Sequence, residues 1–150
     1  MNWDAVFAFT NAVAMIGWVM LAVCPRKPAI LSLILYAAVG LLCLTYAILF
    51  VVLFGNLVDP HRIAGAPPPD LLDYSVDGLR SLFLSDGGIV IGWTHYLAFD
   101  LFAGLWIARE ADARGVGRLA QLPILFATLM AGPIGLLAWL GFREFRTPRQ

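Results

Sequence analysis

The alternation of apolar and polar segments along the 150 residues predicts four membrane-spanning helices. Predominantly apolar runs cover about residues 3–24, 29–54, 89–110 and 119–142. Each run has the roughly 20 residues that a helix needs to cross a hydrocarbon core about 30 Å thick. Short turns join the first run to the second and the third to the fourth, so we expect two antiparallel hairpins. The sequence therefore predicts an all-α, integral membrane four-helix bundle that forms a single transmembrane domain over residues 1–150.

The connection between the second and third runs, residues 55–88, is hydrophilic and carries five Asp against two Arg. Apolar residues recur in it at intervals of four, three and four positions: Leu72, Val76, Leu79 and Phe83. This spacing places them on one face of a short amphipathic helix near residues 71–84, which would lie at the membrane interface. Such a helix serves either as an interfacial anchor or as a lid over the mouth of the bundle, and the pattern leaves both open.

The third run holds a single formal charge, Asp100, within Ile89–Ala108. A charge at the bilayer centre costs about 2.5–3.5 kcal/mol on insertion scales, so we expect Asp100 to face a protein interior or a wet cavity. At about 100° per residue, Asp100 shares a helix face with Trp93 and Tyr96, whereas His95 lies roughly 140° away. On a straight helix the carboxyl and the imidazole therefore point to different sides.

The fourth run is interrupted by Pro133, which has no backbone N–H and leaves the carbonyl of Leu129 without its helical donor. This predicts a kink in the middle of the membrane. Gly132 and Gly135 flank the proline and would let a neighbouring helix or a ligand approach closely. Thr128 lies on the same helix face as these glycines.

The composition excludes an ordinary soluble domain, because 61% of the residues are hydrophobic and only 13% are charged. Ten Lys and Arg balance ten Asp and Glu, and no basic stripe with interleaved aromatics is present, so nucleic-acid binding is not expected. His61, His95, Cys24 and Cys43 are too scattered to match a metal-ligand spacing, so we expect no dedicated metal site.

The basic residues do not decide the orientation, because the four-span topology places five of them on each side of the membrane. The short turns that would lie on one side are basic, whereas the long loop on the other side is acidic. We therefore expect both termini on the outer side.

The segment Gly92–Gly104 carries the most specific family signal, supported by Gly132–Gly135 and by Asn11, Trp18 and Pro25. Together these residues resemble a family of four-span membrane proteins similar to the plant abscisic-acid-deficient-four protein, which includes neoxanthin synthase. The resemblance covers most of the chain and implies the same four-helix fold.

One departure from the plant proteins indicates a bacterial-type member, and a second sets the chain apart from many relatives. Tyr96–Phe99 is not what plant members carry between the histidine and the aspartate, and Leu105 stands where relatives often have arginine. The resemblance therefore implies a multi-pass protein of a bacterial inner membrane and makes the plant substrate a less direct guide.

The resemblance also implies carotenoid chemistry. Neoxanthin synthase rearranges one epoxide end of violaxanthin into an allenic alcohol without net redox change, so no cofactor is expected. The reaction needs an acid, a base and an apolar cleft for a polyene. Asp100 and His95 are the catalytic candidates, because a carboxyl away from water favours the neutral form that a general acid needs and histidine carries protons near neutral pH. The candidate substrate-binding residues are Trp93, Tyr96, Asn11, Trp18, Tyr36, Tyr46, Thr128 and Trp139.

Other function classes remain open, namely a carotenoid- or lipid-binding scaffold without catalysis and a small transporter. Asp100 with Asn11, Thr128 or Gln121 would then form only an interhelical network, although such membrane hydrogen bonds average about 0.6 kcal/mol. We expect Tyr36, Asp100, Asn11 and Thr128 to point inward. The expected partners are a carotenoid or other long apolar ligand and membrane lipid, and a homo-oligomer is left open.

Overall fold

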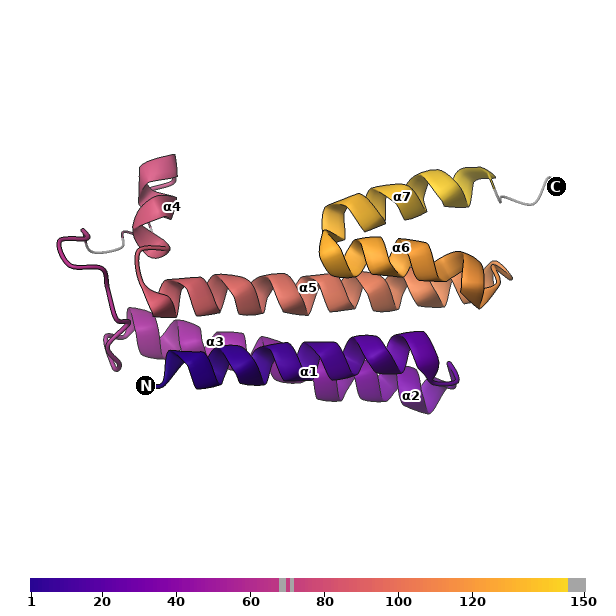
Figure 1. The fold of residues 1–150 in the computed structure, drawn as a ribbon, viewed down its shortest axis with the longest axis horizontal. Coiled ribbons are helices and arrows are strands. Elements are labelled where there is room, and N and C mark those ends of the chain that lie inside the picture. The colour runs from indigo at the N-terminus through magenta and orange to yellow at the C-terminus, as the bar shows by residue number, and fades with distance from the viewer. Residues whose placement is uncertain (68–69, 71, 146–150) are drawn as a thin grey trace.

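The computed structural model describes residues 1–67, 70 and 72–145, and the named elements in this part of the chain are all helices (Figure 1). The elements are α1 (Trp3–Val23), α2 (Pro28–Leu33), the π-helical segment η1 (Ile34–Val39), α3 (Gly40–Phe54), α4 (Val76–Leu82), α5 (Asp86–Ala113), α6 (Arg118–Met130) and α7 (Gly132–Phe145). The segments α2, η1 and α3 run on from one another as one continuous helix, Pro28–Phe54.

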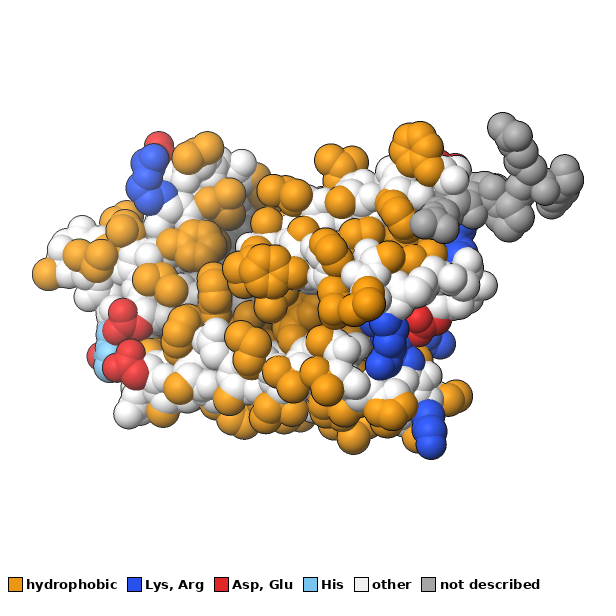
Figure 2. Space-filling model, turned by 45° about the vertical axis from the view of Figure 1, so that its right-hand side comes forward, with side chains coloured by type: hydrophobic (Ala, Val, Ile, Leu, Met, Phe, Trp, Pro, Cys, Tyr) orange, Lys and Arg blue, Asp and Glu red, His pale blue; other side chains and the backbone are white. Residues whose placement is uncertain are grey.

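Three helices are long and apolar enough to span a membrane: α1, the α2–α3 helix and α5. Their bounds agree with the first three predicted helices to within a few residues. The helix α5 begins at Asp86 because the Ser85 hydroxyl accepts a hydrogen bond from the Gly88 N–H at 3.1 Å and so caps its first turn. Hydrophobic side chains are spread over the visible face from end to end, and charged side chains gather towards its two ends (Figure 2). This distribution suits a protein whose middle is surrounded by lipid.

The core lies where α1 and the α2–α3 helix pack against α5 (Figure 1). Leu21 of α1, Leu42 of α3 and Leu101 of α5 are each fully buried there. Lipid tails are as apolar as these side chains, so the hydrophobic effect does not drive the helices together. Close packing and the dispersion contacts between the helices stabilise the core instead.

The prediction of one continuous fourth span at residues 119–142 is wrong. The chain forms two helices there, α6 and α7, which lie antiparallel along one half of α5 (Figure 1). Ala131 between them has φ −160° and ψ 84°, so the helix is broken rather than kinked. With 13 and 14 residues, each helix is about 20 Å long and too short to cross a core of about 30 Å. A four-helix bundle is therefore not what the described residues form.

Glycines allow the two short helices to close on each other. A Cβ atom at Gly135 of α7 would lie 2.5 Å from the Thr128 Cα of α6, well inside ordinary contact distance. A Cβ atom at Gly132 would overlap the carboxylate of Asp100 on α5. The hairpin formed by α6 and α7 therefore needs glycine at both of these contacts.

The hairpin also places the end of the last helix at the opposite end of the molecule from the one that was expected. Because α7 returns to the end of α5 that carries the α1–α2 turn, Trp3 and Phe145 lie at opposite ends of the molecule (Figure 1). The expectation that both termini share one side is wrong for the described chain. The turn and hairpin end holds Arg26, Lys27, Arg109, Arg114, Arg118 and Arg143, and the other end holds Arg62 and Arg80. Arg146 and Arg149 lie outside the described residues.

The surface helix α4 is shorter than the predicted 71–84, whose first residue lies outside the described residues. Its start is delayed because the Asp73 carboxylate accepts a hydrogen bond from the Ser75 N–H at 3.0 Å, which favours a turn over a helix. The Ser75 hydroxyl then caps α4 by accepting from the Gly78 N–H at 3.1 Å. Val76 and Leu79 remain exposed, as the proposed interfacial position requires.

Candidate functional site

A groove of about 390 Å³ opens between α3 and the first half of α5, at the end of the molecule that carries α4. Its walls are mainly aromatic and aliphatic, whereas the loop contributes polar groups. We call it the His95 groove, and the residues that define it include Tyr46, Phe50, Arg62, Phe83, Ile91 and His95. Its size and its few polar groups are typical of sites for apolar small molecules.

The imidazole of His95 is exposed on this groove and lies among aromatic rings. Its centroid is 5.6 Å from that of Tyr46 on α3 and 4.6 Å from that of Phe99 one turn further along α5. One turn earlier, a Cβ atom at Gly92 would collide with the Phe83 ring, so glycine lets the segment after α4 close over the groove. No described residue hydrogen-bonds to the ring nitrogens of His95, which leaves both for a ligand.

The loop before α4 is tied down beside the groove. The indole of Trp3 donates to the Asp59 carbonyl at 3.1 Å, and the Ile63 N–H donates to the Leu84 carbonyl at 3.1 Å. The Arg62 guanidinium donates to the Pro67 carbonyl at 3.0 Å and lines the groove. Hydrogen bonds to backbone carbonyls therefore fix the loop that forms the polar end of the groove.

Asp100 lies on the opposite face of α5, against the break between α6 and α7. The residue is 8% exposed, and its carboxylate rests against the backbone of Gly132 at the start of α7. Its Oδ2 atom is buried without a hydrogen-bond partner among the described residues. A helix start carries a partial positive charge, so this position suits a carboxylate.

Tyr96 supports the other side of the same break. Its hydroxyl donates to the Met130 carbonyl at 3.0 Å and lies 3.5 Å from the Leu129 carbonyl. These carbonyls end α6 and have lost their helical donors, as the position of Pro133 predicted for Leu129. Tyr96 and Asp100 therefore anchor the tip of the hairpin to the middle of α5.

A family model described as ABA DEFICIENT 4-like matches residues 5–139. The chain belongs to this family. The resemblance read from Gly92–Gly104 is thus confirmed, and the match includes the His95 groove and the hairpin up to Trp139. No curated protein and no solved structure matches the chain.

In this ABA DEFICIENT 4-like protein, the structure does not bring the two catalytic candidates into one cavity. His95 faces the groove beside α3, and Asp100 faces the hairpin, as their angular separation on one helix predicted. Tyr46 lies with His95, whereas Tyr96 lies with Asp100. No group of three or more His, Cys, Asp or Glu is placed to hold a metal ion in the part of the chain that the structure describes.

The tryptophan and amide candidates lie outside the His95 groove. Trp93 is partly exposed on α5 and its indole donates to the Asn11 side-chain oxygen of α1 at 3.1 Å. Trp18 is buried against Gly104. Trp139 is fully buried and donates to the Glu110 carboxylate at 2.7 Å.

The inward positions expected for four residues are found only in part. Asp100 and Thr128 are buried, and Thr128 donates to the Ile124 carbonyl at 2.8 Å, whereas Asn11 is half-buried. The expectation for Tyr36 is wrong, because this residue is 75% exposed. The face of the α2–α3 helix that carries Tyr36, Val39 and Cys43 lines an open surface groove and not the closed core.

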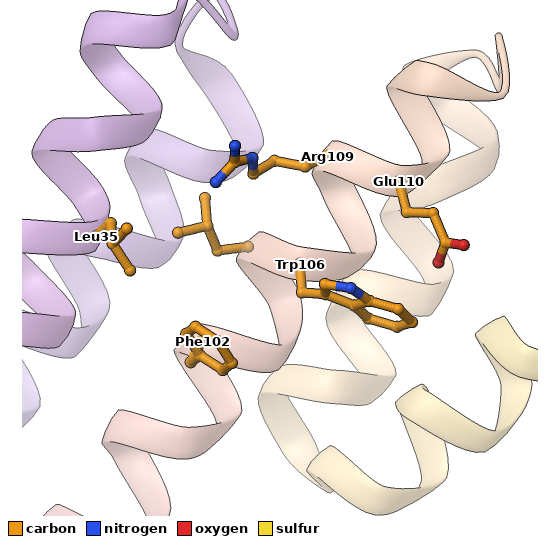
Figure 3. Close-up of a pocket in the computed structure, with 6 residues that line it drawn as sticks. Leu35, Phe102, Trp106, Arg109 and Glu110 are labelled. Atoms are coloured by element: carbon orange, nitrogen blue, oxygen red, sulfur yellow. The ribbon is translucent and has the colours of Figure 1, made fainter.

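Some residues that line pockets along α5 were not predicted from the sequence. Arg62 and Phe83 belong to the His95 groove but come from the loop side, for which no local pattern predicts the contact. At the other end of α5, Trp106 and Arg109 line a second pocket of about 330 Å³ with Leu35 of η1 (Figure 3). Their helical spacing from His95 was the signal that would have found them.

Proposed function

We propose that this protein is a membrane-embedded, carotenoid-modifying isomerase that acts on an oxygenated end group, as neoxanthin synthase does. Membership of the ABA DEFICIENT 4-like family supports the substrate class. The observation that carries the proposal is the His95 groove, where an imidazole that hydrogen-bonds to no described residue lies among aromatic rings beside a polar mouth. Three helices that can span a membrane support a multi-pass protein whose groove receives its ligand from the lipid side.

The proposed rearrangement needs one proton carrier at the end group. The epoxide C–O bond next to the polyene opens, the oxygen takes a proton from the His95 imidazolium, and the adjoining polyene carbon releases a proton to the neutral imidazole. The epoxide becomes an alcohol and an allene without net oxidation or reduction. One histidine suffices because the proton it donates is returned in the same reaction.

This proposal gives the two catalytic candidates different tasks. His95 would exchange protons with the ligand, and Tyr46 and Phe50 would form the aromatic walls. Asp100 would hold the start of α7 and so act as a positioning residue for the hairpin. Its Oδ2 atom, which has no hydrogen-bond partner among the described residues, would then lie at the helix break and not contact the ligand.

The test is to replace His95 by Gln in protein purified into lipid nanodiscs and supplied with an epoxidised carotenoid. We expect product, separated by chromatography and identified by its absorption spectrum, to form at least about 10²-fold more slowly, the usual loss for an acid–base group. Bound pigment should remain. His61→Gln is the matched control, because it removes the other histidine, which does not line the groove.

Unchanged turnover in His95→Gln would contradict the assignment. If the wild-type protein binds the pigment and never alters it, the carotenoid-binding scaffold is the better description.

The break between α6 and α7 favours one second candidate, a small transporter. Transporters place their sites where half-helices end near charged groups in mid-membrane, and Asp100 stands at such a point. Proton or solute flux into vesicles that is abolished by Asp100→Asn would support this candidate, and absence of flux in the wild-type protein would reject it.

A further inference from the structure

We propose that the pocket at Arg109 is a second subsite, which binds an oxygen-bearing group at the far end of the same elongated ligand. This inference rests on the proposed function and extends it, because Arg109 would select ligands by their length and by a polar group at the far end. The ligand class is a polyene that carries a polar group at both ends. One end lies in the His95 groove, and the other lies beside Arg109 and Trp106.

The two pockets belong to one continuous surface. The Arg109 pocket shares Leu35 and Phe102 with a neighbouring groove of about 400 Å³. That middle groove reaches Phe99, whose ring lies 4.6 Å, centroid to centroid, from the ring of His95. On α5 the contributing side chains His95, Phe99, Phe102, Trp106 and Arg109 are spaced by four, three, four and three residues, which is one face of a helix.

The opposite wall of this surface is also one face of a helix. Tyr36, Val39, Cys43 and Tyr46 of the α2–α3 helix face these residues at intervals of three, four and three. The wall includes the π-helical segment η1, a deviation that is frequent at functional sites. The middle of the surface is therefore mostly apolar, and its polar groups gather towards its two ends.

Length supports a ligand that spans the membrane. From His95 to Arg109, α5 rises about 21 Å at 1.5 Å per residue, and the His95 groove extends about 10 Å further, to the level of Gly88. The whole surface therefore spans about the thickness of a hydrocarbon core. A carotenoid with an oxygen at each end has its polar groups separated by a rigid polyene that suits this distance. Arg62 at one end and Arg109 at the other supply hydrogen-bond donors.

Arg109 is available to a ligand because the nearby charges pair with one another. Glu110 also lines the pocket, but it binds Arg114 at 3.1 Å and Arg143 at 3.0 Å, and its side chain points from α5 towards the hairpin (Figure 3). Arg109 instead extends towards the α2–η1 side (Figure 3), and no described residue forms an ion pair or hydrogen bond with it. Its guanidinium therefore lies over the pocket without an ion-pair or hydrogen-bond partner among the described residues.

The experiment compares two carotenoids of equal polyene length, one with a hydroxylated ring at each end and one with a single hydroxylated ring. Binding to protein in nanodiscs of zwitterionic phospholipid is measured by quenching of tryptophan fluorescence. We expect wild-type protein to bind the doubly hydroxylated carotenoid about tenfold more tightly, the effect of one hydrogen bond to a charged donor. Arg109→Leu should reduce this ratio to about one.

The control variant is Lys27→Leu, which removes a charge at the same end of the molecule from an exposed side chain outside the pocket. It should keep the tenfold preference. Leu35→Trp provides an independent test, because it fills the junction between the Arg109 pocket and the middle groove. It should weaken binding of both full-length carotenoids but not of a shortened polyene that reaches only the His95 groove.

Three results would overturn the proposal. Equal affinity of the wild-type protein for both carotenoids would reject the second subsite while leaving the chemistry at His95 intact. The pocket would instead bind a lipid headgroup if anionic phospholipid abolished carotenoid binding. This loss would depend on Arg109 and would be equal for both carotenoids. If neither carotenoid binds, the proposed function itself fails, and the second subsite fails with it.

Discussion

Replacing Gly135 by Ala tests whether the α6–α7 hairpin depends on backbone contact. The added Cβ would lie 2.5 Å from the Thr128 Cα, whereas ordinary contacts are 3.4–4 Å. The helices must separate by about 1 Å, because a backbone atom cannot rotate away as a side chain can. Overpacking of this kind costs about 1–3 kcal/mol. The gain in helix propensity from Gly to Ala, at most about 1 kcal/mol, offsets only part of it.

Gly141→Ala is the matched control on the same helix, since a Cβ atom there meets nothing within 4 Å. It carries the propensity gain without the collision and should leave the hairpin unchanged or slightly more stable. The measurement is amide hydrogen exchange of α6 and α7 in nanodiscs, together with the midpoint of unfolding in detergent. We expect faster exchange and a lower midpoint for Gly135→Ala alone.

The His95 groove lies on the other side of α5, so folded Gly135→Ala protein should retain its turnover. Equal exchange rates in the two variants would refute the close backbone contact, and with it the account of why glycine is required at this position.

Two further outcomes follow from the same geometry. Asp100→Asn should keep turnover within about tenfold of wild type, because the carboxylate contacts α7 and not the His95 groove; a loss of about 10²-fold in folded protein would make Asp100 chemical. The basic residues that gather at the hairpin end predict that this end is cytoplasmic. In a variant without Cys24 and Cys43, a membrane-impermeant thiol reagent should therefore label Ala64→Cys and spare Ala113→Cys on intact cells, and the reverse pattern would show the opposite orientation.

The three long spans and the separation of His95 from Asp100 could be predicted from the sequence, because both depend on local order along one helix. Apolar length decides whether a segment can cross a bilayer, and the 3.6-residue period decides which side chains share a face. The same period links His95 to Arg109 along α5, although this link was recognised only in the structure. The family could be recognised in the same way, from residues that are neighbours in the chain.

The reversal at Ala131 was decided by tertiary contacts. Pro133 frees backbone groups equally in a kinked helix and in a broken one, so the local sequence is compatible with both. The broken form is stable here because Tyr96 donates to the end of α6, and because Asp100 and Thr128 meet glycines of α7. These partners come from a different helix or the far side of the break, and no sequence period relates them.

The candidate site likewise depends on assembly. Tyr46 and His95 are 49 positions apart in the chain, and Arg62 and Phe83 reach the same groove from a loop with no regular spacing. Side chains such as Trp18 and Trp139 have the same chemistry as a pocket wall, yet they are buried against neighbouring helices. Residue type and spacing determine what a side chain can do, but only the packing of α3, α4 and α5 decides which ones share a cavity, because that packing sets the distances between segments remote in sequence.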